Sequence, residues 1–264
     1  GNRTLVYHFG ESLTDTDEFL YIDLGAAAAG WQTIERDLAA DLAAKKPGED
    51  FSRVRKIQFR GSASIDNVVS KTAGGDDRIH GGNDNDTLNG GAGDDIVNGG
   101  AGTDAVSGGA GDDRLIGGTG EDTIDGGDGE DTVLYNSAST TVEVDLEAGT
   151  GTVDGEIDTI SNVENVNGGT GDDILYGDDL ANELRGLGGD DKIVGRKGAD
   201  ELFGYDGDDI LKGGKDSDTL RGGNGNDKGR GGKGDDSIYA GRGDDVVKAG
   251  KGNDMVWGQA GEDK

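Results

Sequence analysis

The chain has 264 residues, of which 54 are glycine and 5% are aromatic. Its 55 acidic and 25 basic side chains leave a formal charge of −30 at pH 7. A chain this poor in large apolar residues cannot offset its loss of conformational entropy with a conventional hydrophobic core. The composition therefore excludes an ordinary globular domain and leaves a disordered or a metal-stabilised chain. The negative charge also disfavours nucleic acids and anionic membranes as partners.

The sequence has no cysteine, so it can form neither disulfides nor a thiolate metal site. No stretch approaches the ~18 apolar residues of a transmembrane helix. The first residues do not resemble a signal peptide. The chain opens on Gly1 and stops at Lys264 inside a repeat, so we expect it to be a fragment of a longer protein.

Residues 1–60 are predicted to be a flanking segment with strands and one short helix at about residues 33–46. Ile34, Leu38 and Leu42 fall on one face of that helix, among alanine and charged residues. We expect the helix to pack over an exposed side or end of the structure that follows. The alternative interpretation is a helix that docks a partner protein.

Two blocks of repeats follow, at residues 61–134 and 168–264, each built from nine-residue units. The unit is Gly-Gly-x-Gly-x-Asp-x-U-x, where U is aliphatic, and residues 61–69 are a degenerate copy. The aspartates at the sixth position of the unit are Asp77, Asp86, Asp95, Asp104, Asp113, Asp122, Asp131, Asp173, Asp191, Asp200, Asp209, Asp218, Asp227, Asp236, Asp245, Asp254 and Asp263. Residues 135–167 interrupt the repeat and are predicted to be a β insert, because apolar and polar residues alternate there.

The spacing of the unit predicts an all-β fold, a parallel β-roll. The x-U-x triplet is long enough for one short strand with one inward side chain, and the glycine-rich residues before it suit a turn. Strand, turn, strand and turn then complete one coil of two units. Residues two units apart stack at the spacing of adjacent strands, about 4.8 Å. The aspartates are therefore expected to form two columns, one along each flank.

Such columns require cations. Two carboxylates roughly 5 Å apart repel by about 3 kcal/mol at an effective dielectric constant of 20. About a dozen such pairs exceed a typical stability of about 5–15 kcal/mol. Carboxylate and carbonyl oxygens on flexible glycine-rich turns suit calcium, which takes about six to eight oxygen ligands. Magnesium fits less well, since it demands strict octahedral geometry.

The repeat resembles the RTX (repeats-in-toxin) family over roughly residues 61–264. The resemblance implies that sixth-position aspartates and turn carbonyls bind calcium between successive coils. Counting the spaces between stacked coils gives about 10–15 ions. It also implies export from a Gram-negative bacterium through a type I secretion channel, followed by folding in extracellular calcium. The glycines whose turns would supply carbonyl ligands are Gly91, Gly93, Gly100, Gly102, Gly109, Gly111, Gly118, Gly120, Gly169, Gly171, Gly214, Gly223, Gly225, Gly232 and Gly234.

Several units depart from the pattern. Asn182 replaces an aspartate, which is expected to weaken one site by removing a charge. The second glycine is absent from four successive units, which puts those turns in doubt; the residues there are Asp178, Leu187, Arg196 and Tyr205. Gly229 replaces an aliphatic residue, so we expect a loosened or bent coil there.

No catalytic motif accompanies the repeats, so the chain is predicted not to be an enzyme. Its two histidines, His8 and His80, are too far apart in sequence for a metalloprotease helix. Paired acids such as Asp94 and Asp95 could serve acid–base chemistry. Because such pairs recur in nearly every unit, they are interpreted as calcium-site acids.

Lysines recur at the third position of alternate units and should form a column on one flank: Lys215, Lys233 and Lys251. Arg221, Arg230 and Lys248 add charge nearby. The simpler interpretation is compensation of the acids, and the alternative is a strip that binds an acidic surface polysaccharide.

For the whole module we expect a structural or adhesive scaffold of a secreted or cell-surface protein. Two alternatives are the export and folding appendage of a secreted enzyme (a protease, lipase or polysaccharide-modifying enzyme) and the repeat region of a toxin.

Overall fold

A computed structural model describes residues 4–8, 19–23, 56–60 and 75–264 of the chain. The first three ranges are the strands β1 (Thr4–His8), β2 (Phe19–Asp23) and β3 (Lys56–Arg60). They form an antiparallel sheet in the order β2-β1-β3. The helix predicted at residues 33–46 and the degenerate repeat at residues 61–69 lie outside the described residues.

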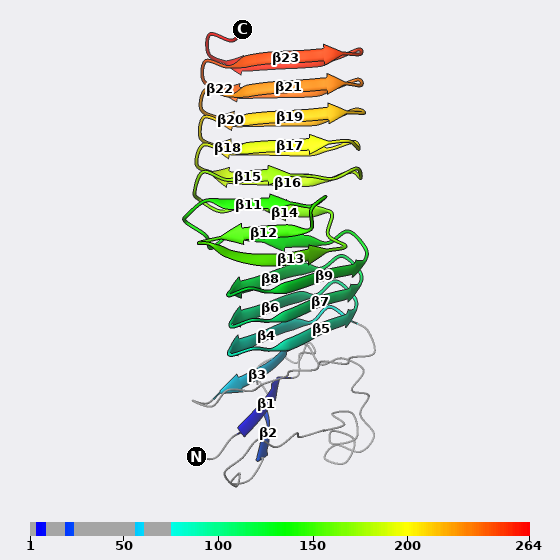
Figure 1. Cartoon of the computed structure of the whole chain (residues 1–264), viewed down its shortest axis with the longest axis vertical. Coiled ribbons are helices and arrows are strands. Elements are labelled where there is room, and N and C mark those ends of the chain that lie inside the picture. Colours follow the sequence, from blue (N-terminus) through cyan, green and yellow to red (C-terminus); the bar gives the residue numbers. More distant parts are fainter. Residues whose placement is uncertain (1–3, 9–18, 24–55, 61–74) are drawn as a thin grey trace, which may run out of the picture.

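Residues 75–264 form an all-β solenoid of about ten coils, as the repeat predicts (Figure 1). Two sheets face each other. The ten-stranded sheet contains β4 (Arg78–Asn83), β6 (Ile96–Ala101), β8 (Arg114–Thr119), β10 (Thr132–Leu134), β14 (Asn165–Asn167), β16 (Glu183–Gly188), β18 (Glu201–Asp206), β20 (Thr219–Asn224), β22 (Ser237–Arg242) and β24 (Met255–Ala260).

The eleven-stranded sheet contains β5 (Thr87–Ala92), β7 (Ala105–Ala110), β9 (Thr123–Asp128), β13 (Glu156–Ser161), β12 (Thr150–Val153), β11 (Val142–Asp145), β15 (Ile174–Tyr176), β17 (Lys192–Arg196), β19 (Ile210–Lys215), β21 (Lys228–Lys233) and β23 (Val246–Lys251). Outside the insert, neighbouring strands in both sheets are parallel and lie two units apart, so that Ile79 pairs with Val97 and Leu88 with Val106. The chain therefore completes one coil for every two repeats.

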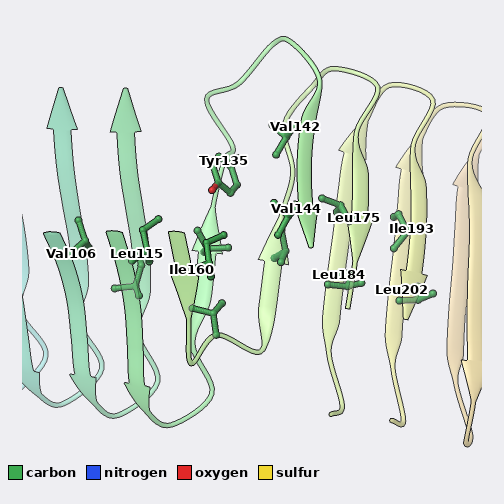
Figure 2. Close-up of a cluster of buried hydrophobic side chains, with 14 of the residues drawn as sticks. Val106, Leu115, Tyr135, Val142, Val144, Ile160, Leu175, Leu184, Ile193 and Leu202 are labelled. Atoms are coloured by element: carbon green, nitrogen blue, oxygen red, sulfur yellow. The ribbon is translucent and has the colours of Figure 1, made fainter. Parts of the chain in front are cut away.

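The core is two facing rows of aliphatic side chains, one residue from each repeat (Figure 2). Leu115, Ile193 and Leu202, for example, are fully buried. The rows are buried along most of the roll and become exposed at the last coil, where Val256 is 47% exposed. Each repeat thus contributes a single side chain to the core, and the rest of each coil consists of turns and strand residues outside the core.

The insert at residues 135–167 continues the roll instead of separating two rolls. In the eleven-stranded sheet, β12 lies antiparallel between β11 and β13, whose outer edges pair in parallel with β15 and β9. In the ten-stranded sheet, β10 pairs directly with β14. Tyr135 and Val142 from the insert join the core (Figure 2). The two repeat blocks therefore form one continuous rod.

The expectation of a bent or loosened coil at Gly229 is wrong. β21 runs from Lys228 to Lys233 in unbroken register with β19 and β23, and Gly229 pairs with Leu211 and Val247. The backbone ladders on both sides hold the strand, so a missing side chain leaves unfilled core space without changing the path of the chain.

Replacing Gly229 by alanine should therefore stabilise the roll. The new Cβ would lie 3.3 Å from Ile238 Cγ2 and 3.9 Å from Val247 Cγ2, so it fills core space with a small adjustment of Ile238. Less entropy in the unfolded chain and one more buried methyl should raise the free energy of unfolding by about 1 kcal/mol. Denaturant unfolding in saturating calcium measures the change.

The matched control is Gly231→Ala, two residues along the same strand. Its Cβ would lie 2.3 Å from Asp236 Oδ2 and 2.4 Å from the Ala249 carbonyl oxygen, so this variant should be less stable than the parent. Equal destabilisation by both alanines would contradict the packing described for Gly229.

Candidate metal centres

The sixth-position aspartates form two buried columns, one along each sheet, as expected. From Asp77 to Asp245 each of them is at most 7% exposed, while Asp254 in the terminal coil is partly exposed and Asp263 is exposed. From Asp95 onward, Oδ1 of each aspartate accepts a hydrogen bond from the backbone of the coil before it. The Asp77 N–H donates to Asp95 Oδ1 and the Asp95 N–H donates to Asp113 Oδ1, each at 2.7 Å. This ladder ties each coil to the next.

The second carboxylate oxygen, Oδ2, is buried in these aspartates and accepts no hydrogen bond within the described part of the chain. The residues concerned are Asp95, Asp104, Asp113, Asp122, Asp131, Asp191, Asp200, Asp209, Asp218, Asp227, Asp236 and Asp245. A buried carboxylate oxygen with no donor is costly, since it loses water and gains nothing in return. Each of these oxygens therefore lacks an electropositive partner.

Main-chain carbonyl oxygens lie around the same space. A Cβ built on Gly108 would lie 2.2 Å from Asp113 Oδ2 and 2.7 Å from the Gly126 carbonyl oxygen of the next coil. The carbonyl oxygens at the second and fourth positions also point along the rod: a Cβ on Gly109 would lie 2.1 Å from the Gly91 oxygen. A carboxylate oxygen beside a carbonyl oxygen of the next coil, on turns whose other carbonyls also point along the rod, offers the oxygen ligands that a hard cation with flexible coordination takes, which fits calcium.

In residues 75–264, no three acidic or histidine side chains lie so that they alone could hold a metal ion. The candidate sites therefore differ from an all-carboxylate cage. Each would draw its charge from single aspartates of successive coils and its remaining ligands from carbonyl oxygens. Calcium held there would supply the positive charge that the buried carboxylates lack.

The paired acids have different surroundings. In the pair Asp94–Asp95, Asp95 is buried, whereas Asp94 lies on the surface and its Oδ1 accepts the N–H of Asp112 at 3.0 Å. Asp112 in turn accepts the N–H of Glu130. This outer ladder runs in the opposite direction to the inner one, because each fifth-position side chain accepts from the following coil. The outer acids thus accept a backbone hydrogen bond and are exposed to solvent. The inner acids are buried, and their Oδ2 atoms accept no hydrogen bond within the described part of the chain.

At three positions in and after the insert, the buried side-chain oxygen accepts a hydrogen bond from another group of the chain. The Tyr135 hydroxyl donates to Asp158 Oδ2 at 2.8 Å, and the Gly169 N–H donates to Asp173 Oδ2 at 2.6 Å. Asn182 Oδ1 accepts the Asp178 N–H, and its Nδ2 donates to the Glu164 carbonyl oxygen, each at 2.9 Å. Asp173 is therefore unlike the other predicted ligands, and the Asn182 amide supplies a donor that an aspartate lacks.

The backbone of the turns agrees with this division. All the glycines predicted as carbonyl ligands have φ in the left-handed region except Gly169 and Gly171, which precede Asp173. Leu187, Arg196 and Tyr205 keep the left-handed conformation in place of glycine, with φ of 82°, 82° and 78°. Three of the four turns that the sequence put in doubt are therefore regular, and the turn at Asp178 is not.

Sequence analysis missed two members of the columns. Asp158 continues one column, since its Oδ1 accepts the Asp122 N–H at 3.0 Å, and Glu164 continues the other, since its Oε2 accepts the Asp131 N–H at 2.9 Å. A signal was present: Asp158-Thr-Ile repeats the triplet Asp122-Thr-Ile at a spacing of 36 residues, which is four repeat units.

The lysine column is confirmed. Lys215 pairs with Lys233, and Lys233 with Lys251, on β19, β21 and β23. All three are exposed, and none forms an ion pair with another residue of the described chain. The neighbouring charges divide between the sheets. Arg230 and Lys248 lie on this eleven-stranded sheet, whereas Arg221 lies on the opposite one, so the prediction that Arg221 adds charge near the column is wrong.

Burial raises the pKa of many column carboxyls, and neighbouring carboxylates add to the rise. The pKa rises to about 8 in Asp191 and to about 7 in Asp200 and Asp209. It rises to about 6 in Asp95 and Asp113, because desolvation outweighs the hydrogen bond from the coil before. Without a cation, the folded columns therefore retain protons that an unfolded chain has released.

The metal-free roll should consequently be more stable in acid. The folded pKa values of about 6–8 lie above the unfolded value of about 3.9. At any pH between these values, the folded state therefore binds more protons than the unfolded state. Stability is then greatest below about pH 4 and falls as the pH rises through the folded pKa values. Circular dichroism of calcium-stripped protein from pH 4 to pH 8 should show β-structure lost with rising pH. A gain of β-structure over that range would contradict the burial of these carboxyls.

Filling the oxygen-lined space should impair the response to calcium. Gly108→Ala puts a methyl group against Asp113 Oδ2, so the variant should need more calcium to fold. Gly188→Ala is the control, since the nearest atom to its Cβ is the Asp206 carbonyl oxygen at 3.9 Å. The calcium concentration at the midpoint of folding, followed by circular dichroism, compares them, and equal midpoints would argue against a site beside Asp113.

The model of one protein family, RTX calcium-binding nonapeptide repeat (4 copies), matches the chain in nine overlapping segments. Together they cover residues 72–139 and 161–264, more than half of the chain. The unmatched residues 140–160 contain β11, β12 and most of β13, the antiparallel part of the insert. No curated protein matches the sequence. Among the described residues, no helix is long and apolar enough to cross a membrane.

Proposed function

Because the chain belongs to the RTX calcium-binding nonapeptide repeat family, we propose that it is the calcium-dependent rod of a larger secreted bacterial protein, with a structural or adhesive role. Its repeats bind calcium and form the β-roll module of the family. The observation that carries the proposal is the set of buried Oδ2 atoms without donors, repeated from coil to coil along both columns.

Folding in this proposal is switched by the calcium concentration. The repulsion within each column opposes the roll until cations neutralise it, so metal binding supplies folding free energy. Extracellular calcium modules typically have dissociation constants of roughly 0.1–1 mM. The chain would stay unfolded in the calcium-poor cell and fold after export. RTX proteins are typically secreted by Gram-negative bacteria, and we assign this chain to the outside or the surface of such a cell.

The scaffold role is supported by the shape and the uniformity of the rod. Both sheets run through the insert without a break, so residues 75–264 form one continuous rod. The columns and the core repeat along its length. We propose that the module acts without catalysis of its own, as a spacer and a binding surface.

An acidic polysaccharide of the cell surface or matrix is the partner that we propose for this surface. On a chain of net charge −30, the lysine column offers three exposed ammonium groups that form no ion pair with any residue of the described part of the chain. Replacing Lys215, Lys233 and Lys251 by glutamine should reduce retention of the calcium-loaded chain on an immobilised acidic polymer. Unchanged retention would show that the lysine column does not bind the polymer.

Calcium titrations of matched variants test the switch. The purified chain should show a coil spectrum in chelator and β-structure in millimolar calcium, with magnesium a poor substitute. Asp113→Asn removes a charge from the buried column and should raise the midpoint roughly twofold to tenfold. Asp112→Asn removes the same charge from the adjacent, exposed position and keeps the oxygen that accepts the Glu130 N–H, so its midpoint should barely move.

The comparison separates a local site from general charge reduction. If both variants shift the midpoint equally, net charge rather than the buried column controls folding. A compact, protease-resistant chain in chelator at neutral pH would overturn the switch altogether.

A further inference from the structure

An open groove of about 540 Å³ lies on the outer face of the ten-stranded sheet, whereas the lysine column lies on the eleven-stranded sheet. Polar, cationic and aromatic side chains line it: Tyr205, Asp206, Arg221, Asn224, Arg242 and Gln259 are among them. The calcium-binding repeat does not account for this set, because the third and ninth positions of the unit are free to vary and Tyr205 and Gln259 replace the glycine of the second position.

The groove arises from the second position of four successive units on this sheet. Tyr205, Gly223, Gly241 and Gln259 are direct neighbours across β18, β20, β22 and β24. The two glycines have no side chain and form a floor, while Tyr205 and Gln259 stand at its two ends. Three strand spacings separate the ends, about 14 Å. A floor of this length accommodates a short segment of a linear chain lying along the rod.

Aromatic and guanidinium groups beside the floor are held in place by one another. The Arg221 guanidinium carbon lies 4.9 Å from the centre of the Phe203 ring and 5.5 Å from that of Tyr239. Tyr239 stacks on Trp257, with ring centres 4.4 Å apart. Phe203 also stacks with Tyr205, at 5.8 Å, and Tyr205 remains 42% exposed. The groove thus presents an ordered, accessible phenol ring.

The lining contains two cations, Arg221 and Arg242, and one acid, Asp206, which already accepts a hydrogen bond from Asn224 Nδ2. Arg221 pairs with Glu201 outside the groove at 3.1 Å. Arg242 is exposed and forms no ion pair or side-chain hydrogen bond within residues 75–264. A free guanidinium fork matches a carboxylate in a bidentate pair, and the amides of Asn224 and Gln259 can bond hydroxyl groups.

We propose that this groove binds a short segment of an acidic polysaccharide, with a hexuronate ring against Tyr205 and its carboxylate at Arg242. An apolar sugar face suits an exposed aromatic ring, and the free guanidinium of Arg242 favours a charged sugar over a neutral one. The inference rests on the acidic polysaccharide proposed above as partner, and it assigns recognition of individual sugar rings to the groove rather than to the lysine column.

Calorimetric titration of the full chain in saturating calcium tests the groove. The probe is the trisaccharide of galacturonic acid, which is too short to span many coils, and its methyl ester is the uncharged control ligand. The parent chain should bind the acid at least tenfold more tightly than the ester. Arg242→Gln and Tyr205→Gly should each weaken binding at least tenfold. Glycine is already the residue at this position in the neighbouring coils, so Tyr205→Gly leaves the turn undisturbed.

Arg230→Gln is the matched control, because it removes one exposed cation from the opposite sheet and should leave the affinity unchanged within twofold. Circular dichroism of every sample shows whether the roll is folded. A folded parent chain that gives no saturable binding at millimolar trisaccharide overturns the inference and leaves the calcium-dependent rod intact. Equal binding of acid and ester, or an equal loss in Arg230→Gln and Arg242→Gln, also overturns it.

Discussion

The whole molecule depends on a buried carboxylate oxygen that has no donor. In each regular turn one oxygen of the sixth-position aspartate joins the coil before it, and the other faces a space bounded by carbonyl oxygens. One such group would be a local cost, but here it recurs along two columns. Desolvation and mutual repulsion raise the pKa of the carboxyls, to about 8 in Asp191. A cation is the partner that removes both penalties at once, which explains why this sequence can be so poor in apolar residues.

The rest of the coil follows from keeping that space open. First-position glycines are needed where a methyl group would touch Oδ2, as at Gly108. Second- and fourth-position residues turn left-handed so that their carbonyls point to the next coil. Only one residue per repeat remains for the core, and the two facing rows of aliphatic side chains are the result. At two positions a hydrogen-bond donor of the chain takes the place that a cation would have. The Tyr135 hydroxyl donates to Asp158 Oδ2, and the Asn182 amide donates to the Glu164 carbonyl oxygen.

The periodic part of this structure was predictable and the aperiodic part was not. A nine-residue unit with one aliphatic and one acidic position determines the register, the two columns and the core, because every coil repeats the same local solution. The insert has no such repetition, so its antiparallel β12 and the column members Asp158 and Glu164 were missed, although the triplet at Asp158 carried a signal. The bend expected at Gly229 was wrong, since backbone ladders outweigh one missing side chain. The groove arises from Tyr205 and Gln259, which lie three strand spacings apart on one sheet although 54 residues separate them in sequence, a neighbourhood visible only once the coils are stacked.

The two outer faces of the rod then have different chemistry, lysines on the eleven-stranded sheet and an aromatic, arginine-lined groove on the ten-stranded sheet. Both depend on a roll that calcium holds together. The most direct test of that premise is the anomalous diffraction of calcium in crystals of the loaded chain. The account predicts density about 2.3–2.6 Å from the Oδ2 atoms that lack donors, and none at Asp158, Asp173 or Asn182. A folded roll without such density, or with density only beside the exposed fifth-position acids, would contradict it.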